Sequence, residues 1–240
     1  MIAQGGRRRI VVFGGTSGIG LACAERLARR EADLWVVSRS PLRAEERLAA
    51  LSNVRLAAVD ATDDAAVQDF FKELGFCDDV IVSMAGGAYI GPFAGLGDEE
   101  LDRSIDCKLR GYIHVARAAL AVLAPSGSLT LVTGLTASRP VPGAATLALL
   151  NGALESLVLT LAVECAPRRV NAVSPGTTDT PAWERLPPGA RRSLFDGAAE
   201  RTPLGRAAAS DDVAAAIAAL LDASFVTGVV LPCDGGARLA

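Results

Sequence analysis

The sequence has little of what metal, membrane or nucleic-acid proteins need. His114 is the only histidine, and no group of histidines, cysteines and acidic residues has metal-ligand spacing, so we expect no metal. No apolar run reaches the roughly 18 residues that cross a bilayer, so we expect no membrane partner. The formal net charge is −3, which gives no electrostatic case for binding nucleic acid.

Cysteine is sparse, and none of the five residues stands in a C-x-x-C motif. This pattern predicts free thiols, mostly buried, in a reducing compartment. Charges and glycines precede the first apolar run, so we expect no signal peptide and a cytoplasmic protein. The five are Cys23, Cys77, Cys107, Cys165 and Cys233.

The composition favours one folded domain, because half of the 240 residues are hydrophobic and only 21% are charged. β-branched runs alternate with helical patterns, and strands separated by helices pair in parallel. We therefore predict a single α/β domain over residues 1–240: a Rossmann-type, doubly wound parallel sheet in a three-layer α/β/α sandwich. A proline-rich stretch, 175–203, lacks either pattern, and we expect a substrate lid over about 177–208. Strands are predicted at 9–13, 33–38, 54–59, 79–83, 128–133, 170–173 and 229–231, and helices at 21–28, 44–51, 64–73, 98–123, 144–165 and 211–221.

A glycine-rich turn between the first predicted strand and helix organises the chain. Gly14, Gly18 and Gly20 have no Cβ, so a phosphate can approach the free N–H groups and the positive dipole end of the helix. The spacing is G-x-x-x-G-x-G, which differs from the G-x-G-x-x-G of the general dinucleotide fingerprint. The alternative is a tight turn without a ligand. In this strand–turn–helix position we predict a dinucleotide site, which also includes Thr16, Ser17 and Ile19.

Further motifs follow at the ends of later strands. They are Ala85-Gly86-Gly87, Ser174-Pro175-Gly176 and the ending Thr227-Gly228…Asp234-Gly235-Gly236. Together with the glycine turn, their order and spacing resemble the short-chain dehydrogenase/reductase family over nearly the whole chain. The resemblance implies an NAD(P)-dependent oxidoreductase acting on a small molecule. Ala85, Gly86 and Gly87 would lie by the cofactor ribose, and Pro175 and Gly176 beside the nicotinamide, with Thr177, Thr178 and Thr180 as hydroxyl donors.

The end of the second strand bears on the choice of cofactor. Proteins that bind NAD place an acidic residue there, which binds the ribose 2′-hydroxyl, whereas this chain has Ser38-Arg39. Arg39 offers a guanidinium fork to a 2′-phosphate, with help from Arg43, so we expect NADP(H) to be preferred over NAD(H). The alternative is a surface arginine. Asp60 resembles the family's carboxylate beside the adenine, with Ala61 next to it.

The catalytic residues are where the chain departs from the family. The resemblance implies a Ser, a Tyr, a Lys and an Asn, and these positions fall on Gly134, Leu147, Asn151 and Lys108. No tyrosine follows Tyr112, so a small shift of the alignment does not restore the motif. Lysine and asparagine have changed places, which predicts that Lys108 keeps a cation in the site and Asn151 a hydrogen bond to the ribose. The alternative is that Lys108 extends to solvent and the site is inactive.

Other polar and aromatic side chains are weaker candidates. Thr133, Thr136, Ser138 and Tyr89 are expected to face the pocket. Trp183, Leu186 and Phe195 line either a substrate cavity or the lid's own small core. His114 is expected to be a packing or surface residue.

Three functions remain open at this point. The first is an NADP-dependent oxidoreductase with an altered proton donor, acting on a carbonyl or alcohol. The second is a non-redox enzyme that uses Lys108 as acid or base. The third is a cofactor-binding protein without catalysis. The helix predicted at 144–165 is apolar nearly all round, which predicts a homotetramer or at least a homodimer.

Overall fold

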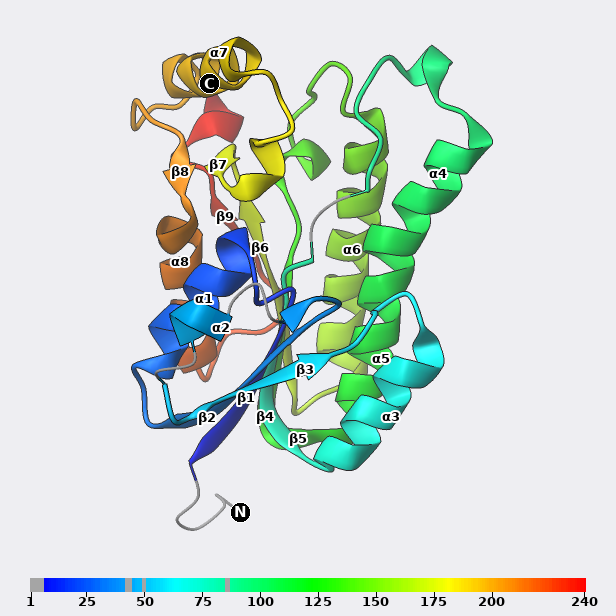
Figure 1. Ribbon diagram of the computed structural model, residues 1–240, viewed down its shortest axis with the longest axis vertical. Helices are drawn as coiled ribbons and strands as arrows, with labels where there is room; N and C mark the ends of the chain where they lie inside the picture. The colour runs from blue at the N-terminus through cyan, green and yellow to red at the C-terminus, as the bar shows by residue number, and fades with distance from the viewer. Residues whose placement is uncertain (1–6, 42–44, 49–50, 85–86) are drawn as a thin grey trace.

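A parallel sheet forms the centre of the computed structural model, which describes residues 7–41, 45–48, 51–84 and 87–240 (Figure 1). Its seven strands run in the order β3-β2-β1-β4-β5-β6-β9, and every neighbouring pair is parallel. The order reverses between β1 and β4, which creates a crevice at the carboxyl ends of the strands, where open α/β sheets bind ligands. The strands are β1 (Arg8–Phe13), β2 (Ala32–Ser38), β3 (Val54–Ala58), β4 (Cys77–Val82), β5 (Leu123–Val132), β6 (Arg169–Pro175) and β9 (Val230–Cys233).

Helices cover both faces of the sheet, as predicted for a three-layer sandwich. Figure 1 shows α1, α2 and α8 on one face and α3, α5 and α6 on the other. The helices are α1 (Gly18–Ala28), α2 (Glu45–Leu48), α3 (Asp64–Leu74), α4 (Asp98–Ser104), α5 (Gly111–Val122), α6 (Ala145–Glu164), α7 (Pro188–Glu200) and α8 (Ser210–Asp222). The Rossmann-type fold is therefore confirmed.

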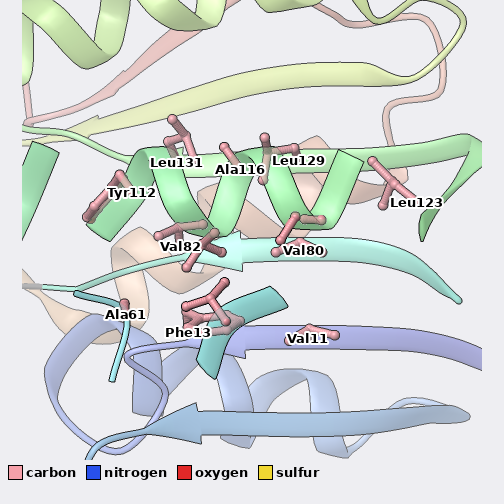
Figure 2. Packing of buried hydrophobic residues seen from close by; sticks show 14 of the residues in the cluster. Val11, Phe13, Ala61, Val80, Val82, Tyr112, Ala116, Leu123, Leu129 and Leu131 are labelled. Atoms are coloured by element: carbon pink, nitrogen blue, oxygen red, sulfur yellow. The ribbon is translucent and has the colours of Figure 1, made fainter. Parts of the chain in front are cut away.

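The central strands are buried on both sides because their side chains alternate between two hydrophobic clusters. In β1, Ile10 and Val12 pack beneath α1 and α8, whereas Val11 and Phe13 pack beneath α3 and α5. Figure 2 shows Val11 and Phe13 facing the same cluster as residues of β4, β5 and α5. The β-branched runs of the sequence therefore predicted the sheet well.

The stretch 175–203 is more regular than predicted. It contains the helix α7 and the short strand β7 (Thr178–Asp179), which pairs in parallel with β8 (Ala208–Ala209) just beyond the stretch. Proline at the first position of α7 is compatible with a helix start, because that residue needs no hydrogen-bonded N–H. The proline, glycine and arginine residues of α7 interrupt its apolar pattern, so the sequence did not predict this helix.

The helix predicted at 98–123 is interrupted by a π-helical segment, η3 (Ile105–Arg110), between α4 and α5. Such segments are rare and are frequent at functional sites. The backbone then turns extended at Leu123, so β5 starts earlier than the sequence pattern predicted.

Two expectations from composition need correction. By length and composition, with a mean hydropathy of 1.7, α6 could cross a membrane, although a core helix meets the same criterion. All five cysteines are free thiols, as predicted, but only Cys23 and Cys77 are buried and the other three are half-buried.

Tyr112 ties together the carboxyl ends of two central strands. Its side chain is fully buried, and its hydroxyl lies 3.0 Å from the carbonyl oxygen of Met84 and 2.9 Å from that of Val132. The hydroxyl thus holds the segment after β4 against the end of β5, at the edge where the site is expected.

We predict that Tyr112→Phe lowers the free energy of unfolding by about 1–3 kcal/mol, because it removes the one hydroxyl donor that the Met84 carbonyl and the buried Val132 carbonyl share. Urea denaturation would measure the loss as a lower midpoint at an unchanged slope. Tyr89→Phe is the matched control, since the Tyr89 hydroxyl donates to Pro92 in an exposed loop. Equal midpoints for the two variants would contradict the role given to Tyr112.

Candidate functional site

The glycine turn between β1 and α1 is a set of backbone contacts that exclude side chains. A Cβ on Gly20 would collide with the carbonyl of Gly14, and a Cβ on Gly14 would collide with the carbonyl of Ser83 after β4. Gly14 and Gly18 also have positive φ angles of 76° and 51°, which favour glycine. The turn therefore places α1 directly against the ends of β1 and β4.

The N-terminus of α1 has no side-chain cap. Ser17 is the N-cap, is exposed, and makes no side-chain hydrogen bond to the first turn. Thr16 and Ile19 beside it are half-buried. The first N–H groups of the helix and its positive dipole end are thus available to a phosphate.

At the ends of β2 and β3, Arg39 and Asp60 come close enough to interact. The pKa of Asp60 lies below its usual range mainly because the Thr62 N–H donates to it, with a smaller contribution from the charge of Arg39. Arg39 is exposed, and Ser38 is half-buried with its hydroxyl accepting from the backbone of Ser40. Arg43 lies outside the described residues.

His114 has a contact that the sequence did not indicate. Its Nδ1 lies 3.0 Å from the carbonyl oxygen of Ala61, which requires the proton on Nδ1 because a carbonyl only accepts. Ala61 itself is buried. His114 on α5 therefore fixes the backbone beside Asp60, and no motif could have revealed it.

The turn after β4 packs on the π-helical segment. Ala85 and Gly86 lie outside the described residues. Gly87 has a φ of 84°, and a Cβ there would lie 2.8 Å from the sulfur of Cys107. The predicted ribose-binding turn thus contacts η3 one residue before Lys108.

The end of β6 and the start of the predicted lid form another wall. A Cβ on Gly176 would lie 3.0 Å from Cα of Asp234, so Pro175 and Gly176 are held close to the chain after β9. The Thr178 hydroxyl donates to the Gly176 carbonyl at 3.0 Å, and the Trp183 indole donates to the Thr178 carbonyl at 2.9 Å. Thr178 therefore uses its proton within the wall, whereas Thr177 is half-buried.

Thr180 brings the lid to the glycine turn. A Cβ on Gly18 would meet the Thr180 methyl group at 3.1 Å. The start of the predicted lid therefore contacts Gly18, the first residue of α1.

Gly134 and Asn151 are in direct contact. A Cβ on Gly134 would lie 2.8 Å from Nδ2 of Asn151, so the asparagine amide fills the space beside the glycine. The same Nδ2 donates to the Thr136 hydroxyl at 2.9 Å. Asn151 is 3% exposed, and its Oδ1 has no hydrogen-bond partner among the described residues. An unpaired buried amide oxygen is costly unless a ligand or water supplies a donor.

Lys108 is buried within η3. Its side chain is 9% exposed, and its Nζ lies 5.5 Å from the centre of the Tyr112 ring, within the range of a cation–π contact. Burial lowers the pKa of Lys108 from 10.5 to about 8. The side chain therefore does not extend into solvent, and its ammonium gives up a proton more readily than an exposed lysine.

The remaining polar candidates divide into two groups. Thr136 contacts Asn151, but Thr133 donates to Glu155 on α6 at 2.9 Å, and Ser138 and Tyr89 donate to backbone carbonyls of their own loops. Glu155 was not predicted, although it stands one helical turn after Asn151. Leu147 is half-buried one turn before Asn151. In the described parts of the chain, no group of three acidic, histidine or cysteine side chains could hold a metal ion.

The chain is similar to known proteins over nearly its whole length. A family model described as enoyl-(acyl carrier protein) reductase matches residues 14–238. L-xylulose reductase of Bos taurus is 32% identical over 95% of this chain and 96% of its own length. A small-chain dehydrogenase solved in complex with NADPH is 29% identical, with a TM-score of 0.84, and covers 98% of this chain and 100% of its own. The structure of the MalC reductase/Diels-Alderase from Malbranchea aurantiaca is 26% identical, with a TM-score of 0.89 and 98% coverage of both chains.

We predict that Lys108→Met stabilises the cofactor-free protein by up to about 3 kcal/mol at pH 7, because methionine avoids the burial of an ammonium group. The folded-state pKa of about 8 lies below the ordinary value of 10.5, so the unfolded chain binds more protons between these pH values. Wild-type stability should therefore rise with pH through that window, and the advantage of methionine should disappear near pH 10.5.

Urea denaturation at several pH values measures this effect. Lys72→Met on the exposed face of α3 is the matched control, since Lys72 is the only other lysine. If the free energy of unfolding of Lys108→Met differs from that of the wild type by the same amount at every pH from 7 to 10.5, the assigned burial of Lys108 is wrong.

Proposed function

This chain belongs to the short-chain dehydrogenase/reductase family, and we propose that it binds NADP(H) and transfers a hydride between this cofactor and a carbonyl or alcohol at an altered catalytic site. The family and its relatives are NAD(P)-dependent oxidoreductases, so the chain is an oxidoreductase of this type. The observation that carries the proposal is the close backbone packing at Gly14 and Gly20, together with an N-terminus of α1 that has no side-chain cap and can offer its N–H groups to a phosphate.

The cofactor preference rests on the end of β2. An acidic residue there would repel a 2′-phosphate, whereas Arg39 can form a charge-assisted, two-pronged hydrogen bond with it. The charge of Arg39 lowers the pKa of Asp60, the carboxylate expected beside the adenine. The guanidinium is therefore near the end of the proposed site that would hold the adenosine. The relative solved with NADPH supports the same choice.

The altered site is proposed at Gly134, Leu147, Asn151 and Lys108, in place of the family's Ser, Tyr, Lys and Asn. Leucine and glycine have no proton to give, and losing a positioned general acid typically costs about 10²–10⁴ in rate. Lys108 supports the proposal because its pKa of about 8 suits proton donation near neutral pH. Asn151 offers its unpaired Oδ1 to a ribose hydroxyl.

In the reduction direction NADPH, when bound, supplies the hydride. The carbonyl carbon gains this hydride and the oxygen becomes an alkoxide. Lys108 then donates its proton to that oxygen, which gives the alcohol and a neutral amine, and the amine takes up a proton from solvent after the product has left. The lid from 177 to 208 is proposed to exclude water from the step, since its base lies on the glycine turn.

A non-redox reaction in the same pocket is the second candidate. The lowered pKa of Lys108 suits an acid or a base in such a reaction, and the similar MalC protein is a reductase/Diels-Alderase. A protein that binds the cofactor without catalysis is the third.

NADPH oxidation over a panel of aldehydes and ketones tests the proposed function. We expect slow turnover in the wild type and in Lys72→Met, and loss of at least tenfold in Lys108→Met, because the latter has no acid. Tight NADPH binding without turnover would favour the third candidate. Turnover that Lys108→Met leaves unchanged would refute the role of Lys108.

The cofactor preference makes a separate prediction. NADPH should bind more tightly than NADH by roughly tenfold to a hundredfold, the value of one charge-assisted hydrogen bond, and Arg39→Ala should remove most of this gap. Fluorescence titration with both cofactors measures it. Arg29→Ala, at the opposite end of α1, is the matched control, and equal affinities in the wild type would overturn the preference.

Assembly is proposed to use α6. Its outer face carries exposed apolar or small residues at helical spacing, from Leu149 through Ala153 and Ser156 to Val163, and Gly152 borders open space. An apolar helical stripe of this length favours a symmetric helix-on-helix contact with a second copy. We therefore propose a homodimer or homotetramer in the cytoplasm.

Light scattering tests the assembly. Leu159→Arg on the apolar face should shift the protein toward the 24.7 kDa monomer, because it buries a charge in the contact. Leu204→Arg, on the lid, should leave the assembly unchanged. A wild type that is monomeric at micromolar concentration would rule out this proposal.

A further inference from the structure

Large apolar side chains are exposed on the loops that surround the carboxyl edge of the sheet. Phe93 and Leu204 are each 70% exposed, and Leu239 is 83% exposed. The others are partly exposed, at 49% for Ile90 and 42% for Val141. We call these five residues the apolar rim.

The rim belongs to segments that are far apart in the sequence but bonded to one another. The N–H of Gly91 donates to the carbonyl of Gly143 at 2.8 Å, which joins the loop after β4 to the loop before α6. The guanidinium of Arg139 donates to the carbonyl of Ala240 at 3.0 Å. The N–H of Leu204 lies 3.3 Å from the carbonyl of Gly235, which joins the lid to the chain after β9.

These bonds connect the rim residues around one edge of the fold, the upper end of Figure 1, where α7 and the C-terminus lie. Single exposed hydrophobic residues need no explanation, but a group gathered around a ligand-binding edge indicates a binding surface. Gly134 and the glycine turn follow the carboxyl ends of β5 and β1, so the rim lies at the same edge of the sheet as the proposed active site.

The proposed active site, like the rim, is apolar at two of its catalytic positions. Leu147 presents hydrocarbon where an acid would be expected, and Gly134 presents no side chain. A small polar substrate would leave these apolar surfaces in contact with water, so they would add little to its binding affinity. A bulky apolar substrate would remove both from water, which is the main source of affinity for such molecules.

We infer that the substrate is a bulky, mainly hydrocarbon molecule, such as a fused-ring ketone or its alcohol, whose apolar body lies against the rim while its reacting group reaches Lys108. This inference rests on the proposed function and assigns its substrate class. The occupant of the rim is the substrate itself rather than a second protein.

Binding and turnover of ring ketones test the inference separately. Equilibrium dialysis of the NADPH-loaded protein would measure affinity for cyclohexanone, 2-decalone and a four-ring steroid ketone. We expect affinity to rise at each step of the series, and KM to fall in parallel wherever turnover is seen. Rising affinity without turnover would refute the redox proposal and still support the rim.

Two variants keep the test specific to the rim. Phe93→Ala should weaken binding of the steroid ketone about tenfold while leaving kcat nearly unchanged, and Ile90→Ala should act in the same direction. Phe225→Ala is the matched control, since Phe225 is fully exposed in the loop that enters β9 from the opposite edge. Equal affinity along the ketone series, or equal effects of Phe93→Ala and Phe225→Ala, would overturn the inference.

Discussion

The backbone contact between the glycine turn and the end of β4 is the constraint on which the site depends. Gly20 lies against the Gly14 carbonyl, and Gly14 lies against the Ser83 carbonyl, so neither position can carry a side chain. This contact aims the N-terminus of α1 at the crevice between β1 and β4. The other groups are arranged around it: Arg39 stands at the end of the neighbouring strand, and Thr180 packs on Gly18 from the lid.

The proposed catalytic wall, made by Gly134, Asn151 and Lys108, is internally consistent. Asn151 occupies the space beside Gly134, so a serine at Gly134 would push the asparagine amide away from its present place. Two features of the wall are costly to the apo protein: the unpaired Oδ1 of Asn151 and the buried amine of Lys108. Such costs are expected at functional sites, where ligands supply the missing partners.

Sequence patterns predicted most of the fold, because β1, β4 and β6 are buried on both faces and therefore stand out as β-branched runs. They did not predict η3, because no residue type or motif at 105–110 marks the change from i→i+4 to i→i+5 hydrogen bonds. They also left open whether Lys108 is buried, because that depends on Tyr112 and on packing between η3 and α6. Thr133 was expected in the pocket, but its partner Glu155 is visible only once α6 is folded.

The central claim is that this chain keeps the family's cofactor cradle while its catalytic groups have been replaced. Its most direct test is the rate of NADPH oxidation with cyclohexanone by the fourfold variant Gly134→Ser, Leu147→Tyr, Lys108→Asn, Asn151→Lys, compared with the wild type. The account predicts a rate at least about 10²-fold higher in the variant, because a phenol acid returns to a site that already binds NADPH. A variant that binds NADPH as the wild type does, but reduces cyclohexanone no faster, would contradict it.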